Sequence, residues 1–188
     1  PSAGDEAPWM ALNAVRKVRW VIMTPMSQWQ TKQWPLLHWE QLIRMQLDSD
    51  PDVAVCLMGS PSDAPHLHQL AQAVNSERVE IAAGWRLLEA AFAMSQVEVV
   101  VTNDSGPLHL ASAVNAPTVA VFCSTSPRFG FGPLADHSEV VEVEEPLSCR
   151  PCGMHGHKRC PESHFLCGFN VSATKVDQAM QRVIALRG

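Results

Sequence analysis

The sequence predicts an α/β fold built on a doubly wound parallel β-sheet, and two observations support this prediction. Short apolar runs of strand length alternate along the chain with amphipathic segments of helical length, which is typical of βαβ units. Some of these runs, such as Val53–Met58 (VAVCLM), are apolar at every position, as expected for parallel strands covered by helices on both faces. A length of 188 residues is sufficient for one well-buried domain.

The first half of the chain contains three expected strands and two expected helices. The strands are short, largely apolar runs, and the helices are indicated by apolar residues that recur at helical spacing. In chain order these elements are the strand Arg19–Pro25, the helix Trp34–Leu47, the strand Val53–Met58, the helix Pro65–Val74 and the strand Val79–Ala83.

The second half repeats this alternation. Its run VEVVVT is the clearest strand in the sequence, and its last helix has apolar residues along one side. In chain order the expected elements are the helix Leu87–Met94, the strand Val97–Thr102, the helix Pro107–Val114, the strands Thr118–Cys123 and Glu139–Val143, and the helix Val171–Leu186.

We expect one domain over residues 19–188, preceded by a linker over residues 1–18 that carries a short helix, Trp9–Val15. Within the domain, a Cys-rich loop is expected over residues 146–170 and a closing helix over residues 171–188. The chain begins with proline instead of methionine, and we expect it to be part of a longer protein.

Composition excludes some classes of partner. The formal net charge of −5 argues against nucleic acid, because phosphate backbones are bound by basic surfaces. No apolar run reaches the length that a bilayer requires. Four of the six cysteines crowd together near the C-terminus, unlike the spread of a secreted disulfide scaffold. We therefore expect a cytoplasmic protein.

In a Rossmann-like sheet, ligands bind beyond the carboxyl ends of the strands, where the strand order reverses. The loops that follow Pro25, Met58, Val101 and Cys123 should share that edge. Each of these loops carries polar residues suited to a phosphorylated ligand.

The most informative loop runs from Asn103 to His109 (NDSGPLH). A strand leads directly into Asp104, Ser105 and Gly106, and Pro107 suits the first turn of a helix. Free backbone N–H groups at such a helix start can bind a phosphate, and a glycine lets the ligand approach the backbone. The alternative is a capped helix in which Asp104 or Ser105 satisfies the helix's own amides. His109 is not explained by capping, although it could be an ordinary half-buried histidine.

The loop after the first strand carries Lys32 and ends in Trp34-Pro35, which opens a helix. A lysine on a loop is usually only solvated. At this sheet edge, however, it would neutralise the charge that grows on a departing diphosphate, which is a contribution to the transition state. Thr24, Ser27 and Thr31 can add hydroxyl donors.

Two further strand-end loops carry polar residues. Asp63 follows a glycine turn after the second strand, where an acidic group either caps a helix or hydrogen-bonds a ribose. Ser124 and Thr125 lie in a loop of small polar residues, CSTSP, whose backbone donors suit a phosphate.

Together these four segments resemble glycosyltransferase family 9, the heptosyltransferases of lipopolysaccharide core assembly. That family shows a P-G-S/A…K-x-W-P loop, a G-x-x-x-D/E turn, a D-S/T-G-x-x-H-x-A-A-A element and a G-P/S-T-x-P loop. The matching residues here are Pro25-Met-Ser…Lys32-Gln-Trp34-Pro35, Gly59-Ser-Pro-Ser-Asp63, Asp104-Ser-Gly-Pro-Leu-His109-Leu-Ala-Ser-Ala113 and Cys123-Ser-Thr-Ser-Pro127.

The resemblance implies one half of a GT-B glycosyltransferase, the C-terminal domain that holds ADP-heptose. It implies that Lys32 contacts the diphosphate and Asp63 the ribose. It also implies that Asp104, Ser105, Gly106 and His109 line the phosphate and sugar end. Transfer would be inverting and would require no metal. The general base and the surface for the lipopolysaccharide acceptor would belong to an N-terminal domain that this chain lacks, and the whole enzyme could be peripheral at the inner membrane.

The chain departs from the family pattern at two positions. Met26 and Cys123 each stand where the family has glycine, which puts the substrate in doubt more than the fold. Two alternatives stay open. The chain could belong to another GT-B-like nucleotide-sugar enzyme with a different donor, such as an epimerase-type relative. It could also be a non-catalytic Rossmann module with a zinc-binding loop.

The Cys-rich loop offers candidate zinc ligands. Cys149, Cys152, Cys160 and Cys167 follow the spacing C-x2-C-x7-C-x6-C, whose opening pair can share one tetrahedral zinc. Such a zinc would staple the loop and take no part in transfer. The alternatives are two disulfides or reduced thiols packed in a loop. Three nearby histidines are spare candidate ligands: His155, His157 and His164.

Overall fold

A computed structural model describes residues 2–16 and 18–186 of the chain. Four residues lie outside the described part of the chain: Pro1 and Lys17 of the expected linker, and Arg187 and Gly188 at the end of the expected closing helix. The strands are β1 (Arg19–Thr24), β2 (Val53–Gly59), β3 (Val79–Ala83), β4 (Val99–Asn103), β5 (Thr118–Phe122) and β6 (Ser138–Glu142). The helices are α1 (Ala3–Val15), α2 (Leu36–Ser49), α3 (Ala64–Val74), α4 (Leu87–Gln96), α5 (Gly106–Ala113), α6 (Leu166–Phe169) and α7 (Ala173–Ala185), with 3-10 turns η1 (Gln30–Lys32), η2 (Pro61–Asp63) and η3 (Pro127–Phe129).

The strands form one six-stranded sheet in the order β3-β2-β1-β4-β5-β6, and every pairing is parallel. From β1 the strand number increases outward to β2 and β3 on one side, and from β4 it increases outward to β5 and β6 on the other side. The direction of the strand order therefore reverses between β1 and β4. Their register pairs Thr24 with Thr102 at the carboxyl end. This is the doubly wound, Rossmann-like sheet that the sequence predicts for one half of a GT-B enzyme, and the predicted fold class is confirmed.

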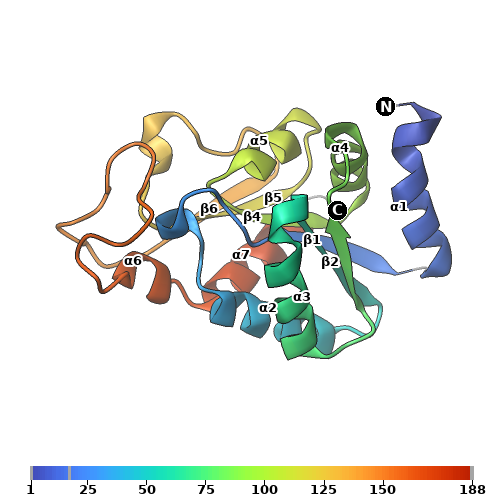
Figure 1. Cartoon of the computed structure of the whole chain (residues 1–188), viewed down its shortest axis with the longest axis horizontal. Helices are drawn as coiled ribbons and strands as arrows, with labels where there is room; N and C mark the ends of the chain where they lie inside the picture. The colour runs from blue at the N-terminus through green and yellow to red at the C-terminus, as the bar shows by residue number, and fades with distance from the viewer. Residues whose placement is uncertain (1, 17, 187–188) are drawn as a thin grey trace.

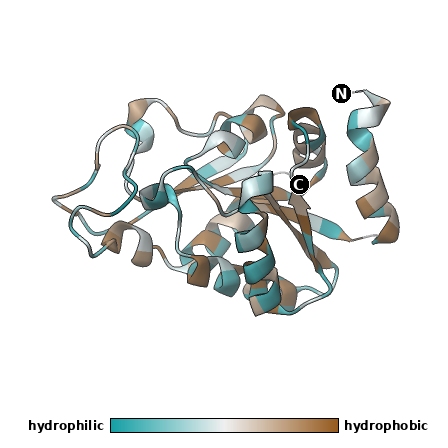
Figure 2. Cartoon of the chain, in the orientation of Figure 1, coloured by the Kyte–Doolittle hydropathy of each residue, from teal (hydrophilic) through white to brown (hydrophobic). Residues whose placement is uncertain are grey.

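Helices cover both faces of the sheet (Figure 1). Helices α2, α3 and α7 lie on one face and α1, α4 and α5 on the other. Alternate side chains of β1 point to opposite faces: Val21 and Met23 pack with α2 and α7, whereas Trp20 and Ile22 pack with α1 and α4. The hydrophobic colouring accordingly concentrates on the central strands (Figure 2).

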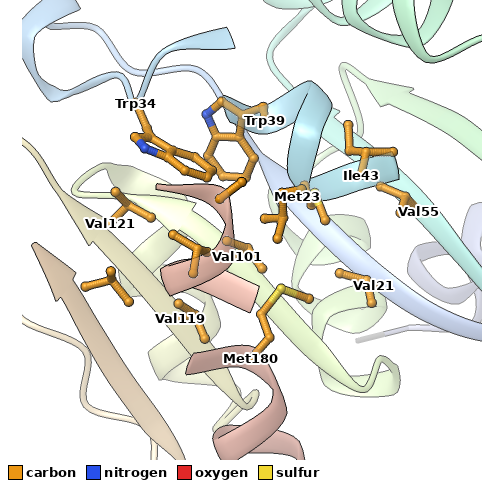
Figure 3. Packing of buried hydrophobic residues seen from close by; sticks show 14 of the residues in the cluster. Val21, Met23, Trp34, Trp39, Ile43, Val55, Val101, Val119, Val121 and Met180 are labelled. Atoms are coloured by element: carbon orange, nitrogen blue, oxygen red, sulfur yellow. The ribbon is translucent and has the colours of Figure 1, made fainter. Parts of the chain in front are cut away.

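The larger core lies between the sheet and α2 and α7 (Figure 3). Trp34 and Trp39 meet edge to face there, with ring centroids 5.1 Å apart, and Met180 of α7 belongs to the same core, near Val119. The indole Nε1 of Trp34 donates a hydrogen bond to the carbonyl of Val171 at 2.8 Å. Because Trp34 directly follows the loop that carries Lys32, this packing anchors one end of that loop in the core.

The N-terminal helix is longer than the sequence predicts. The expected helix is short, Trp9–Val15, whereas α1 begins at Ala3. Asp5 causes the earlier start, because its carboxylate accepts hydrogen bonds from the backbone and the hydroxyl of Ser2, both at 2.8 Å. Trp9 is buried against Trp20 and fixes the helix on the α4 side of the sheet.

Within the Cys-rich loop, the short helix α6 is not expected from the sequence, because four residues are too few to show helical periodicity. The closing helix, predicted over residues 171–188, forms over Ala173–Ala185. None of the helices in the described part of the chain combines the length and apolarity needed to cross a membrane.

Candidate functional site

Two adjoining hollows open at the carboxyl edge of the sheet. Ser27, Gln28, Ser105 and Gly106 line both of them, so the α5 N-terminus stands at their junction. The first hollow has a volume of about 620 Å³ and the second about 260 Å³. The first alone lies within the range typical of small-molecule sites.

The first hollow is largely apolar. Side chains that follow β1, β2 and β3 and residues of α4 and α5 form its walls, and Thr24 and Asp63 add polar groups. Its apolar lining consists of Met26, Met58, Trp85, Leu87, Ala90, Met94, Pro107 and Leu110. Trp85 is a residue that sequence reasoning missed. Its position just after the third strand of the sheet, on the same edge as the other loops, was the signal that could have found it.

The second hollow has a mixed polar and apolar lining, which comes from distant parts of the chain. Lys32 comes from the β1 loop, Asp104 and His109 from the β4–α5 segment, and His155 from the Cys-rich loop. The rings of His109 and Phe131 meet edge to face with centroids 6.3 Å apart. Lys32, Asp104 and His109 are residues that the sequence pointed to, and the fold brings them together.

Lys32 and Asp104 form an ion pair at the base of the second hollow. The Lys32 Nζ lies 2.7 Å from Oδ2 of Asp104, and both side chains are largely buried. The hydroxyl of Thr125 donates to the same oxygen at 2.6 Å. The pair therefore holds the ammonium group at a fixed position beside the α5 N-terminus.

Asn103 fixes the β1 loop against β4 and was not predicted as a site residue. Its Oδ1 accepts from the backbone N–H of Trp34 at 2.9 Å, and its Nδ2 donates to the carbonyl of Pro25 at 2.8 Å. The side chain is fully buried. An asparagine between an apolar strand and a Ser-Gly helix start was the available signal.

The α5 N-terminus faces the junction of the hollows with its amides open. Ser105 is the N-cap residue, but its side chain makes no capping hydrogen bond. Asp104 is engaged by Lys32 and Thr125 instead. A Cβ added at Gly106 would meet nothing within 4 Å. The alternative of a helix capped by these two side chains is therefore wrong, and the open amides suit an anion.

Thr31 and Ser124 lie behind the second hollow and not at its surface. Thr31 is buried; its hydroxyl accepts from the backbone N–H of His157 at 2.7 Å and from the hydroxyl of Ser124 at 3.0 Å. These two hydroxyls therefore support the wall of the hollow. Thr24 likewise donates its hydroxyl proton to Thr102 at 2.7 Å, although it also lines the first hollow.

Asp63 takes part in local capping and also lines the first hollow. Its Oδ2 accepts from the backbone N–H of Ser60 at 2.8 Å and from the Ser60 hydroxyl at 2.6 Å. Asp63 is the N-cap residue of α3 but makes no side-chain capping hydrogen bond to that helix, so the predicted helix cap is wrong. The ribose role of Asp63 stays a prediction.

The two departures from the family pattern have different consequences. Met26 lines the first hollow and packs against the larger core. Cys123 is fully buried, and burial raises the pKa of its thiol well above the ordinary value. The carbonyl of Cys123 accepts a hydrogen bond from Nε of Arg150 at 2.6 Å. Cys123 thus anchors the Cys-rich loop and does not reach the hollows.

All six cysteines are free thiols in the structure. The Cys152 thiol donates to the carbonyl of Cys149 at 3.0 Å, and the Cys149 sulfur lies 3.9 Å from Nε2 of His164. Among the described residues, no group of three or more histidine, cysteine or acidic side chains is arranged to hold a metal ion. As arranged here, the four clustered cysteines do not fit a zinc site.

The fold and its edge hollows define a class: a Rossmann-like α/β domain with a ligand site at the carboxyl ends of its strands. The chain belongs to glycosyltransferase family 9 (heptosyltransferase), which matches its residues 6–163. The predicted family is confirmed.

Named relatives agree with this family. The chain is 36% identical over 118 residues to lipooligosaccharide heptosyltransferase 2 of Haemophilus influenzae. This alignment covers 61% of this chain and 33% of that protein. It is 31% identical over 116 residues to lipopolysaccharide heptosyltransferase 2 of Escherichia coli, over 60% of this chain and 32% of that protein. The match spans about a third of the length of these relatives.

Solved structures share the fold. ADP-heptose lps heptosyltransferase II of E. coli matches with a TM-score of 0.79 at 22% identity, over 100% of this chain and 53% of that one. A glycosyl transferase family 9 protein of Veillonella parvula matches with a TM-score of 0.81 at 18% identity, over 98% and 52% of the two chains.

Proposed function

We propose that this chain is the donor-nucleotide half of an inverting heptosyltransferase and binds ADP-heptose for transfer to the lipopolysaccharide inner core. The observation that carries the proposal is the junction, at the open N-terminus of α5, of an apolar hollow with one that contains the Lys32–Asp104 ion pair and two histidines. The family and the names of its relatives supply the heptose and the acceptor.

The nucleoside occupies the first hollow in this proposal. Its apolar walls suit the faces of a purine, and Asp63, which sits at the rim beside Ser60, accepts from a ribose hydroxyl. The diphosphate crosses the junction, where the amides of Ser105 and Gly106 donate to its oxygens. The sugar then lies in the second hollow near His109.

Lys32 stabilises the leaving diphosphate. In a single displacement the acceptor hydroxyl attacks the anomeric carbon while the bond to the phosphate oxygen breaks, so negative charge grows on the diphosphate. An ammonium group held by Asp104 at 2.7 Å is already in place when this charge develops. The base that accepts the hydroxyl proton belongs to the N-terminal domain, and this proposal needs no metal for transfer.

Titration calorimetry with ADP, UDP and GDP tests the donor site. We expect ADP to bind most tightly, and a preference for UDP would exclude the heptose donor in favour of another nucleotide-sugar enzyme. Lys32→Ala should weaken ADP binding by about tenfold or more, as expected for a lost charge-assisted hydrogen bond. The control is Lys158→Ala, which removes an exposed lysine of the Cys-rich loop. Unchanged ADP affinity in Lys32→Ala would contradict the diphosphate assignment.

A structural zinc at Cys149, Cys152, Cys160 and Cys167 requires the four thiolates to converge from their present positions. Metal analysis of protein purified without chelator decides this point. Zinc bound at one equivalent supports the site, and a substoichiometric content removes it. In either case the metal takes no part in transfer.

The proposed setting is the cytoplasmic side of the inner membrane, where the whole enzyme would meet its lipid-linked acceptor peripherally. The N-terminal domain would supply both the acceptor surface and the general base. Fractionation of cells that produce the whole protein tests the location, and recovery outside the cytoplasm and the inner-membrane fraction would contradict it.

A further inference from the structure

The Cys-rich loop packs directly against the segments that line the second hollow. Arg150 anchors the start of this loop through hydrogen bonds to the carbonyls of Cys123 at 2.6 Å and Thr125 at 2.7 Å. The backbone N–H of Cys152 donates to the carbonyl of Ser124 at 2.7 Å. The start of the loop is therefore fixed to the segment that follows β5.

Further along, the Cys-rich loop also contacts the loop after β1, which carries Lys32. The backbone N–H of His157 donates to the Thr31 hydroxyl at 2.7 Å, and the backbone N–H of Thr31 donates to the carbonyl of His157 at 3.1 Å. These hydrogen bonds join segments 126 positions apart in the sequence. In Figure 1 the orange loop accordingly lies at one end of the molecule, beside the blue β1 loop.

Gly156 makes the closest approach in this contact. A Cβ at Gly156 would lie 2.9 Å from the Thr31 hydroxyl, 3.1 Å from the Ser124 hydroxyl and 3.3 Å from Cγ of Lys32. The backbone of Gly156 also has a φ of +73°, a conformation that favours glycine. The loop therefore lies directly against the residue that the proposed function assigns to the diphosphate.

This packing brings two side chains of the loop into the second hollow. Met154 and His155 line it together with Lys32, Asp104 and His109. His155 is exposed at the surface of the hollow, so its imidazole is accessible to a ligand. The same wall thus carries an ammonium group and two imidazoles, all of which can donate to phosphate oxygens.

We propose that the Cys-rich loop is part of the donor site, with His155 donating a hydrogen bond to the second phosphate of the bound nucleotide. Gly156 is the positioning residue that lets the loop lie against Lys32. This inference rests on the proposed function, because it takes a nucleoside diphosphate as the ligand. It gives the loop a binding role that does not depend on a metal.

The first test compares His155→Ala with Lys158→Ala by calorimetric titration with ADP and with AMP. AMP lacks the second phosphate, so His155→Ala should weaken ADP binding by about tenfold and leave AMP binding unchanged. Lys158→Ala removes a charge from the same exposed loop, and Lys158 is not among the residues that line either hollow in the described part of the chain. It should leave both affinities unchanged.

The second test compares Gly156→Ala with Gly153→Ala. Both glycines lie on the loop with positive φ, +73° and +79°, but a Cβ at Gly153 would meet nothing within 4 Å. The two variants therefore carry a similar backbone strain, and only Gly156→Ala pushes on Thr31 and Lys32. We expect Gly156→Ala to weaken ADP binding by about fivefold or more, and Gly153→Ala to change it by less than about twofold.

Three results would overturn the inference. One is unchanged ADP affinity in His155→Ala. Another is an equal loss of ADP and AMP affinity in that variant, and the third is an equal effect of the two glycine substitutions. Failure of the unaltered chain to bind ADP would instead reject the proposed function, and this inference with it.

Discussion

At the scale of single residues, Asn103 connects the fold to the candidate site. It is the last residue of β4, and its side chain holds the backbone of Pro25 and Trp34, which bracket the loop carrying Lys32. A buried side chain that hydrogen-bonds two backbone groups stabilises the fold mainly because, without it, those groups would be buried with no hydrogen-bond partner.

Asn103→Ala should lower the free energy of unfolding by roughly 2–4 kcal/mol, because it leaves a buried N–H and a buried carbonyl without their partner. Asn103→Asp should also destabilise, since a carboxylate accepts from Trp34 but cannot donate to Pro25. Urea denaturation measures both effects. Gln69→Ala, an exposed change on α3, is the control, and a loss for Asn103→Ala no larger than that of the control would show that these hydrogen bonds are unimportant.

The thiols divide by burial into an inert and a reactive group. Burial raises the pKa of Cys56 to about 12, with the nearby Glu80 carboxylate adding to the shift. Since thiolate is the reactive form, Cys56 and the fully buried Cys123 should resist iodoacetamide in the folded chain. Cys149 and Cys160 are only half-buried and should be alkylated first.

Mass spectrometry after timed alkylation at pH 8 measures these rates, and urea-unfolded protein, in which all the thiols should react, is the control. Rapid labelling of Cys56 in the folded chain would contradict its burial.

The raised pKa of Cys56 also makes the stability of the fold depend on pH. A thiol that ionises at higher pH in the folded state adds stability that is full below about pH 9 and is lost as the pH rises toward 12.

At the scale of elements, α1 packs on α4 chiefly through Trp9, with Leu12 and the Asp5–Arg86 ion pair as further contacts. Trp9 is 3% exposed and packs edge to face on Trp20 with centroids 5.7 Å apart, and Asn13 accepts from the Trp20 indole at 3.2 Å. Loss of a large buried aromatic side chain costs about 3–5 kcal/mol, and Trp9 is the buried aromatic residue through which α1 contacts the sheet.

Trp9→Ala should therefore release α1 while the sheet stays folded. Amide hydrogen exchange should accelerate across residues 3–15 and remain slow in β1 and β4. The control is Met10→Ala, because Met10 is 55% exposed on the same helix. Global acceleration of exchange in Trp9→Ala would mean that α1 is integral to the core and not a separable element.

The elements differ in how far the sequence predicts them. The central strands were predictable because fully apolar runs such as Val53–Met58 suit burial on both faces. The start of α1 was missed because Pro8 lies inside the helix and Asp5 takes the place of the usual Glu or Gln in its capping box.

Site residues were predictable from the sequence only where they follow a strand, because the ends of the strands fix their place at the edge of the sheet. Lys32, Asp104 and His109 follow strands that end at the same edge, so the edge rule brings them together. The contact between Thr31 and His157 could not be predicted, because it joins residues 126 positions apart through the backbone of an irregular loop. Thr31 and Ser124 therefore look like ligand residues in the sequence and act as supports in the structure.

At the scale of the whole molecule, the reversal of strand order between β1 and β4 determines where the two hollows meet. These two strands are neighbours, and the remaining strands lie outward from them in opposite directions, β2 and β3 on one side and β5 and β6 on the other. The loops that follow β1 and β4 form the junction between the hollows. Among the described residues, the carboxylates that line the hollows are already engaged, Asp63 by Ser60 and Asp104 by Lys32 and Thr125. In the proposed function the site therefore binds an anionic leaving group, and neither of these two carboxylates is free to accept a proton from an acceptor hydroxyl.

The 188-residue chain should consequently bind ADP and transfer no heptose. A general base must lie within hydrogen-bond reach of the proton that it accepts, and the carboxylates of these hollows are committed to other partners. Incubation of the chain with ADP-heptose and a lipopolysaccharide acceptor, followed by mass spectrometry of the acceptor, measures transfer, and calorimetry in the same buffer confirms that ADP is bound. Lipopolysaccharide heptosyltransferase 2 of Escherichia coli serves as the positive control. Heptose transfer by this chain alone would mean that one of these carboxylates leaves its partner to act as the base.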